Sequence, residues 1–286
     1  MLVAAVAALA SAALSALALA ALHRSAGMVR DLPAPAGLGR FLVGNTKHPL
    51  WLLGMTTAAV ALVLHAVALH DGPLTLVQPL MVSGIVFALA LRQLIEGRRP
   101  ARNQLGWAAT LAIGLMLFLL AATPGQGPPQ PPDTGPTLVF VIAIPTGMAV
   151  CALLGRGAQG KRAAALLGAG AGLAFAGAAA LLKEVTDQVT HGLGAVFGAW
   201  PVYALLVAGF FGLVFNQLAF GAAPLPASLP ALSTVDPLAS LAIGVWVFDE
   251  PYRSAAGAVV TELIGLSLVM VAVVALSRHA TTEPRI

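Results

Sequence analysis

Residues 225–250 read LPASLPALSTVDPLASLAIGVWVFDE, a stretch apolar enough to cross a bilayer except for one acid near its middle, Asp236. A carboxylate at the centre of a spanning helix costs roughly 2.5–3.5 kcal/mol on insertion scales, so such residues usually face a bundle interior or a water-filled path. Ser233, Ser240 and Gly244 share the helical face of Asp236. We therefore expect this polar and small stripe to point inward. Pro237 follows the acid and lacks a backbone donor, which predicts a kink or break there.

The chain as a whole has the composition of a membrane protein. Of its 286 residues, 59% are hydrophobic and 9% are charged, and the mean hydropathy is +0.91, whereas soluble domains contain about 25% charged residues. The net charge of +4 comes from basic residues in short loops between apolar segments, where they set membrane orientation. This distribution excludes nucleic acid as a partner and makes the lipid bilayer the expected one. A single cysteine, Cys151, excludes an internal disulfide.

Windows of about 20 apolar residues predict nine transmembrane helices. They cover residues 1–22, 49–69, 73–95, 103–122, 137–155, 161–182, 197–221, 225–248 and 255–276. Lys and Arg divide 13 to 2 between alternate connections, and the basic set marks the cytoplasmic side. We therefore expect an all-α protein of the inner or plasma membrane, with its N-terminus outside and its C-terminus in the cytoplasm. The first segment lacks a basic start, so an uncleaved helix is preferred to a signal peptide.

One connection divides the chain into two halves. Residues 123–136, TPGQGPPQPPDTGP, are rich in Pro and Gly and contain no basic residue, which is typical of a semi-rigid external linker. The linker separates a first half, residues 1–122, from a second half, residues 137–286.

The halves contain an internal repeat at an offset of 151 residues, which aligns residues 62–121 with residues 213–272. The evidence for this repeat is the set of paired prolines and glycines and the match between TLAIGLML (110–117) and TELIGLSL (261–268). Spans two to four correspond to spans seven to nine, an odd displacement, so the two units enter the membrane from opposite sides. This is an inverted repeat. Its paired prolines, Pro79 and Pro230, either interrupt helices near opposite membrane faces or merely bend packed helices.

Two short-turn helix pairs suggest a family. VALHDGPLTLVQPL (67–80) and LAFGAAPLPASLPAL (218–232) are each followed by a span that ends in an acid, Glu96 in one and Asp249 and Glu250 in the other. With the glycine-dotted last helices, this pattern resembles the EamA-like repeat of the drug/metabolite transporter superfamily. The resemblance implies a ten-helix fold with both termini inside, which this chain would adopt without its first helix. A shortened gene start is the other explanation, and the nine-span layout is similar to NIPA-type magnesium transporters.

Motif searches indicate no enzyme and no cofactor. The sequence has no HExxH, no GxSxG, no P-loop and no Cys or His cluster at metal spacing. The run GAGAG (168–172) lies inside an apolar span, where Gly168, Gly172, Ala176 and Ala179 predict a small-residue seam for close helix packing. The sequence identifies no metal site.

The candidate residues for a solute or ion path are the remaining intramembrane polar groups, Asp236, Glu262, His65, Asn216 and Gln78. Asp236 is favoured for a solute, proton or cation path over structural hydrogen bonding, because a neutral residue could serve the latter. For Glu262 the two roles are balanced. His65 could relay protons, but a packing role is the stronger interpretation. Asn216 and Gln78 are more typical of hydrogen bonds between helices.

These patterns predict a transporter that moves a small solute, proton or cation by alternating access around Asp236. The alternative is a membrane scaffold or interaction protein that has kept the fold and lost transport, which the sparse polar lining favours. The sequence leaves open the substrate, the direction of transport and whether the protein forms a homodimer.

Overall fold

The computed structural model describes residues 1–30, 49–95, 102–122, 125, 134–223, 228–251 and 256–279. Within these ranges every regular element is a helix, as the apolar segments predict. The elements are α1 (Leu2–Arg30), α3 (Pro49–Asp71), α4 (Leu74–Met81), α5 (Gly84–Ile95), α6 (Arg102–Ala122), α7 (Thr134–Arg156), α8 (Gly160–Val189), α9 (Leu193–Gly198), α10 (Trp200–Ala222), α11 (Leu229–Val247) and α12 (Ala256–His279).

Eight of the described helices are long and apolar enough to cross a membrane: α1, α3, α6, α7, α8, α10, α11 and α12. The chain is therefore a multi-pass helical membrane protein. The predicted third span differs from the others, because it consists of two shorter helices, α4 and α5. The predicted linker at residues 123–136 lies largely outside the described residues, and α7 already begins within it, at Thr134.

The interruption between α4 and α5 is a tight turn. Pro79 lies in the last turn of α4, where its ring replaces a backbone donor. Beyond it, the backbone nitrogens of Val82 and Ser83 bond three residues back, to the carbonyls of Pro79 and Leu80, and the Ser83 hydroxyl also donates to Leu80. This 3₁₀-type geometry separates the two helices. The repeat mate Pro230 lies in the first turn of α11, a position that tolerates proline.

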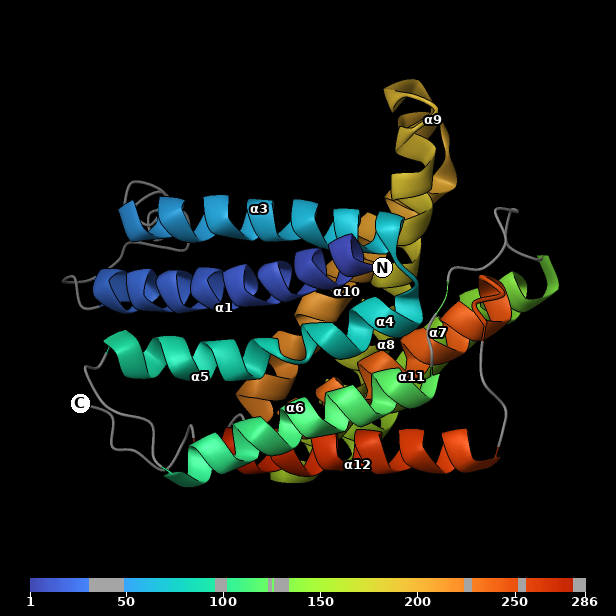
Figure 1. Cartoon of the computed structure of the whole chain (residues 1–286). Helices are drawn as coiled ribbons and strands as arrows, with labels where there is room; N and C mark the ends of the chain where they lie inside the picture. The colour runs from blue at the N-terminus through green and yellow to red at the C-terminus, as the bar shows by residue number, and fades with distance from the viewer. Residues whose placement is uncertain are drawn as a thin grey trace.

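The helices pack largely in neighbouring pairs, as Figure 1 shows. In the first half α1 lies alongside α3, with α5 on the other side of α1. In the second half α8 packs against α7, α10 and α11. Among the described helices, the contacts between the halves include α6 lying along α12, α4 packing against α11 and α3 packing against α8. The second of these contacts positions the candidate site.

The predicted small-residue seam on α8 is confirmed. Ala176 and Ala179 are 0% and 4% exposed, and Gly168 and Gly172 are buried. A Cβ at Gly168 would lie 2.6 Å from the Ser228 carbonyl oxygen, and one at Gly172 would lie 2.9 Å from that of Leu232. Glycine is therefore required where α8 approaches the backbone of α11 this closely.

The α6–α12 contact is equally close and is reciprocal. A Cβ at Gly114 would lie 2.7 Å from the Gly265 carbonyl oxygen and 2.9 Å from the Val269 backbone nitrogen. A Cβ at Gly265 would lie 2.7 Å from the Gly114 carbonyl oxygen and 2.7 Å from the Phe118 backbone nitrogen. The contacts advance along α6 as they recede along α12, so the two helices cross in antiparallel directions.

The helix α11 runs unbroken from Leu229 to Val247 with Pro237 inside it, so the break predicted beside Asp236 does not occur. The proline removes only one helical hydrogen bond, the one to the Ser233 carbonyl. Close packing against the seam of α8 and against α4 holds the rest of α11 in helical geometry.

Candidate functional site

The polar stripe of α11 faces into the protein, as its sequence predicts. Ser240 and Ser233 are 0% and 7% exposed, and Gly244 is buried. A Cβ at Gly244 would lie 3.0 Å from the Thr75 Cγ2 atom, which belongs to α4 of the first half. Because the members of the stripe lie on one helical face, the stripe meets α4 across the contact between the two halves.

Asp236 is partly buried near the middle of this stripe. Its Oδ1 atom accepts a hydrogen bond from the Ser240 hydroxyl at 3.4 Å, a long and therefore weak contact. Its backbone nitrogen packs on the seam of α8, 3.0 Å from where a Cβ at Gly172 would lie. The scaffold thus fixes the backbone of Asp236 firmly, while its carboxylate makes only this weak hydrogen bond among the contacts described.

Two polar residues of α4 lie across from the stripe. Thr75 and Gln78 are 2% and 4% exposed, and a spacing of three residues puts them on one side of α4. Within the described ranges, the Thr75 hydroxyl oxygen and the Gln78 Nε2 atom have no hydrogen-bond partner. The α4–α11 interface, defined by Thr75 and Gln78 and by the stripe of α11, therefore contains buried polar atoms without protein partners.

Around Pro237, the residue that follows Asp236, the two halves meet in apolar contacts. A void of about 10 Å³ lies among Pro79, Val82, Pro237, Phe118 and Val269, which is close to the smallest volume that holds one water. Only apolar side chains line it, so a water there would lack partners. In this conformation the interface is closed.

One end of the interface is closed by Glu250, whose side chain is 0% exposed. Its Oε1 atom accepts a hydrogen bond from the Leu74 backbone nitrogen at 2.6 Å, and its Oε2 atom accepts one from that of Thr75 at 3.0 Å. These nitrogens belong to the first turn of α4, where free N–H groups and the helix dipole favour an anion. The carboxylate thus connects the second half to the first.

Lys183, near the end of α8, is the cationic partner of Glu250. Its Nζ lies 3.6 Å from Glu250 Oε1 and donates to the carbonyl oxygens of Gly72 and Leu69 at 3.1 and 3.4 Å. It also lies 5.5 Å from the ring centroid of Phe248, within range of a cation–π contact. The ammonium therefore neutralises the carbonyls at the end of α3, while Glu250 neutralises the amides that begin α4.

Sequence reasoning missed this pair as a site. The charge pattern assigned Lys183 to the outer loops, and Glu250 served only as an acid at the end of a span. The available signal was that Lys183 and Arg253 are the only basic residues of the outer connections. A lone Lys directly after a long apolar run is better read as a partner for a buried acid.

The structure brings together only some of the predicted site residues. Asp236 lies on α11 and Gln78 on α4, two helices that pack together, and Glu262 is 4% exposed on α12, which also packs against α11. His65 and Asn216 lie on α3 and α10, which pack mainly against α1 and α8. In the part of the chain that the structure describes, no three His, Cys, Asp or Glu side chains are grouped as metal ligands.

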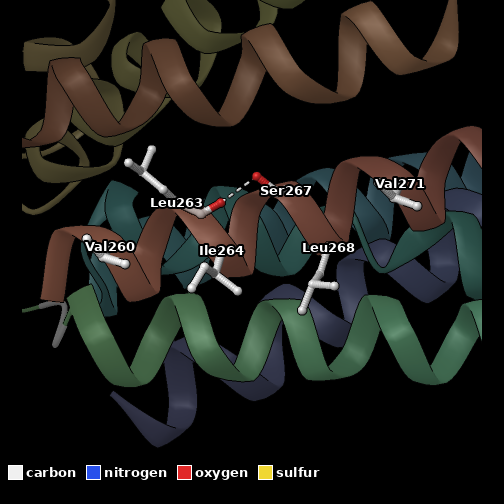
Figure 2. A pocket seen from close by; sticks show the side chains of 6 residues that line it. All are labelled: Val260, Leu263, Ile264, Ser267, Leu268 and Val271. Atoms are coloured by element: carbon white, nitrogen blue, oxygen red, sulfur yellow. Dashed lines mark hydrogen bonds between the residues drawn. The ribbon is translucent and has the colours of Figure 1, made fainter. Parts of the chain in front are cut away.

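A second hollow lies on α12 and has a different character. It is a shallow groove of about 340 Å³ lined by Val260, Leu263, Ile264, Ser267, Leu268 and Val271. Figure 2 shows Ile264 and Leu268 pointing toward α6, and the Ser267 hydroxyl donating to the Leu263 carbonyl at 2.7 Å. With its one hydroxyl satisfied, the groove offers only apolar contacts, which suit lipid chains rather than a polar solute.

Comparison with known proteins places the chain in a family. It is 30% identical, over an alignment of 289 residues, to the uncharacterized protein Cgl0250/cg0304 of Corynebacterium glutamicum, and the match covers 98% of this chain and 96% of that protein. No protein-family model matches the chain, and no solved structure matches it. The chain belongs to the same family as Cgl0250/cg0304 of Corynebacterium glutamicum.

Proposed function

We propose that this protein is a multi-pass membrane transporter that moves a small solute or ion by alternating access, with the α4–α11 interface as its path. The observation that carries the proposal is the pair of buried atoms on α4, Thr75 Oγ1 and Gln78 Nε2, that lack partners within the described ranges. A buried donor or acceptor left unsatisfied costs about 1–3 kcal/mol. Water or solute entering an open interface would supply the missing partners, which favours a state in which the interface opens.

The α6–α12 crossing supports an inverted repeat. Gly114 and Gly265 are repeat mates, and so are Phe118 and Val269. Gly114 packs on the backbone of Val269, and Gly265 packs on the backbone of Phe118. Replacing each residue by its repeat mate therefore turns the first contact into the second. A two-fold axis through the crossing produces this exchange. Because the helices are antiparallel, that axis is perpendicular to them and lies in the membrane plane, as in inverted-repeat transporters.

The divided third span supports the same architecture. Inverted-repeat transporters form their sites from discontinuous helices, whose interrupted backbone is tolerated where it lines a cavity. Here the turn at Val82 and Ser83 lies beside Pro237 of the opposite half. Three predictions from the sequence belong to this proposal: nine membrane crossings, an N-terminus outside, and membership of the drug/metabolite transporter superfamily.

Asp236 is the central ionisable group of the proposed path. Within the described ranges, its carboxylate has one weak contact, with Ser240, so a cation, a proton or a cationic solute would offset its desolvation. Glu262 on the neighbouring helix α12 is the secondary acid. His65 and Asn216, on the symmetric helices α3 and α10, line the path only if the bundle rearranges. Two acids are few for Mg²⁺, which prefers six oxygens, some of them from water.

The second candidate is a membrane scaffold with the same fold. The small void around Pro79, Pro237 and Phe118 favours it, because only apolar side chains line the void. A scaffold would keep the interface closed permanently. A transporter would open it, and the two can therefore be distinguished by flux and by access to the interface.

The test is a transport screen in proteoliposomes. Divalent cations, amino acids and cationic drugs are offered under an imposed pH gradient to the wild type, Asp236→Asn and Asp249→Asn. Asp249 is an exposed acid of the same chain, so its variant controls for loss of a negative charge. We expect the wild type and Asp249→Asn to carry the same solute and Asp236→Asn to lose at least tenfold in rate. Transport by Asp236→Asn at the wild-type rate would reject Asp236 as the site.

A further inference from the structure

We infer that Glu250 and Lys183, together with the first-turn amides of α4, form a gate that closes one end of the α4–α11 interface. The inference rests on the proposed transport path and names a control element in it. The gate consists of Glu250, Lys183, Leu74 and Thr75. It is distinct from Asp236, which lies about two helical turns before Gly244, the residue on which the Glu250 carboxylate packs.

The position of the carboxylate supports a closing role. A Cβ at Gly244 would lie 2.5 Å from Glu250 Oε2, so the carboxylate packs directly on the last member of the polar stripe. On its other side it bonds to Leu74 and Thr75 of α4. Glu250 therefore fills the space where the stripe would otherwise emerge at this end, and its side chain is fully buried in doing so.

The same end lies at the edge of the protein. Asp249 is exposed, and the His70–Asp187 pair, at 3.3 Å, joins the end of α3 to the end of α8 with both side chains about half exposed. If the Glu250 carboxylate left the interface here, it would enter the polar surroundings of the neighbouring residue, Asp249. The interface would then open toward the side of the membrane that Asp249 faces.

The contacts of Lys183 allow the gate to open without isolating a charge. Its distance to Glu250, 3.6 Å, exceeds the usual 2.7–2.9 Å or so of a charge-assisted hydrogen bond. Its bonds to the Gly72 and Leu69 carbonyls do not depend on Glu250. If Glu250 withdraws, the ammonium keeps both carbonyl partners, and only the amides of α4 are released.

The peptide segment that carries Glu250 can act as the moving part. α11 ends at Val247, and residues 248–251 are not helical. The Glu250 backbone nitrogen bonds to the Gly244 carbonyl at 3.0 Å, which joins this segment to α11. A movement of α11 relative to α4 would therefore carry the carboxylate away from the amides. Opening of the interface and opening of the gate become one event.

The test measures access to a cysteine inside the interface. In a Cys151→Ala background, Ser240→Cys places a thiol at a position that is 0% exposed. A charged, membrane-impermeant methanethiosulfonate reagent is applied to each side of the membrane in turn. Asp249→Cys, measured in parallel, reports which side this end of the interface faces.

We expect Glu250→Gln to raise the labelling rate of Ser240→Cys at least tenfold from the side on which Asp249→Cys reacts. Glu250→Asp, which keeps the charge, should lie between Glu250→Gln and the wild type, and Asp249→Asn should match the wild type. If Glu250→Gln does not fold, Lys183→Met is used in its place, and we expect it to give a smaller increase in the labelling rate of Ser240→Cys. Ser267→Cys, on the apolar groove of α12, should stay unlabelled throughout and reports general unfolding.

An unchanged rate in Glu250→Gln would overturn the gate, as would equal acceleration at Ser267→Cys or acceleration from the opposite side only. The labelling does not require transport. Unchanged labelling in a protein that carries solute rejects the gate alone. Accelerated labelling, together with Asp236→Asn transport at the wild-type rate, supports the gate and rejects the proposed Asp236 site.

Discussion

Lys183 and Glu250 lie with their charged atoms 3.6 Å apart, at a point where one helix ends and the next begins. Lys183 bonds the last carbonyls of α3, and Glu250 bonds the first amides of α4. Each charge thus lies at the helix end whose dipole attracts it. This arrangement joins the two halves at the end of α4 and has consequences for stability.

Removing one member of this pair should destabilise the protein. Breaking a buried ion pair by removing one partner costs about 3–5 kcal/mol when the other charge is left uncompensated. Because the Lys183 ammonium keeps the Gly72 and Leu69 carbonyls, we expect Glu250→Gln to cost less than this range. Lys183→Met should cost less than Glu250→Gln, because the Glu250 carboxylate keeps both amide donors. The double variant should cost less than the sum, since Met leaves no buried charge. This double-mutant cycle is measured from the free energies of unfolding of the wild type and the three variants in mixed detergent micelles, with Asp249→Asn as the neutral control. Additive losses would contradict direct coupling.

Alanine at the α6–α12 crossing should also destabilise. In the interior of an ordinary helix, Gly→Ala raises the free energy of unfolding by up to about 1 kcal/mol. At Gly114 or Gly265 the added Cβ would meet backbone atoms at 2.7 Å, so the helices must separate, at a cost of about 1–3 kcal/mol. The repeat mates Gly106 and Gly257 have nothing within 4 Å, so alanine there should be neutral or stabilising. The test compares the thermal unfolding temperatures of the four Gly→Ala variants. Equal shifts for the Gly114/Gly265 pair and the Gly106/Gly257 pair would contradict the close α6–α12 crossing.

The seam between α8 and α11 predicts a similar contrast within one helix. Gly172→Ala would place a Cβ 2.9 Å from the Leu232 carbonyl and push the backbone of Asp236 away from α8. We expect a lower unfolding temperature and a lower transport rate. Gly177→Ala, whose Cβ would meet only the Ile144 side chain at an ordinary 3.5 Å, should change neither. Similar behaviour of the two variants would show that the seam does not position Asp236.

Asp249 should not tolerate a β-branched residue, because of its backbone conformation. Its φ is 49°, in the left-handed region that Asn, Asp and Gly enter most readily. Asp249→Asn and Asp249→Gly should therefore unfold near the wild-type temperature. Asp249→Val should cost about 1–2 kcal/mol from the backbone alone. It should also accelerate labelling of Ser240→Cys, because the strain displaces Glu250. Normal stability and labelling in Asp249→Val would contradict this assignment.

The predictions that rest on helical periodicity are the ones that the structure confirms. The seam on α8 and the inward stripe of α11 follow from spacing alone, because a helix with a narrow small or polar face can bury that face in only one direction. The interruption at Pro79 was one of two alternatives that the paired prolines left open, and it is the one that occurs. Hydropathy could not decide between them, because the residues on both sides are apolar and a window averages over them.

Of the kink or break predicted at Pro237, the break does not occur, and the reason is tertiary. A proline inside a helix removes one hydrogen bond, and the packing of α11 on α8 and α4 outweighs that loss. The link between Lys183 and Glu250 was missed for another reason. Its partners belong to different helices, and a count of loop charges treats every basic residue as solvated. Only the fold shows that this lysine is 11% exposed and bonded to the end of α3.

The most direct test of the account is the distance across the α4–α11 interface in lipid nanodiscs, measured by double electron–electron resonance. In a Cys151→Ala background, spin labels at the exposed positions Val67 and Trp246 report the first and second halves near the Glu250 end. Labels at Leu120 and Val260 report the α6–α12 scaffold. The account predicts two distances for Val67 and Trp246, with the longer one enriched in Glu250→Gln, and one unchanged distance for the scaffold pair. A single, identical distance for Val67 and Trp246 in the wild type and in Glu250→Gln would contradict it.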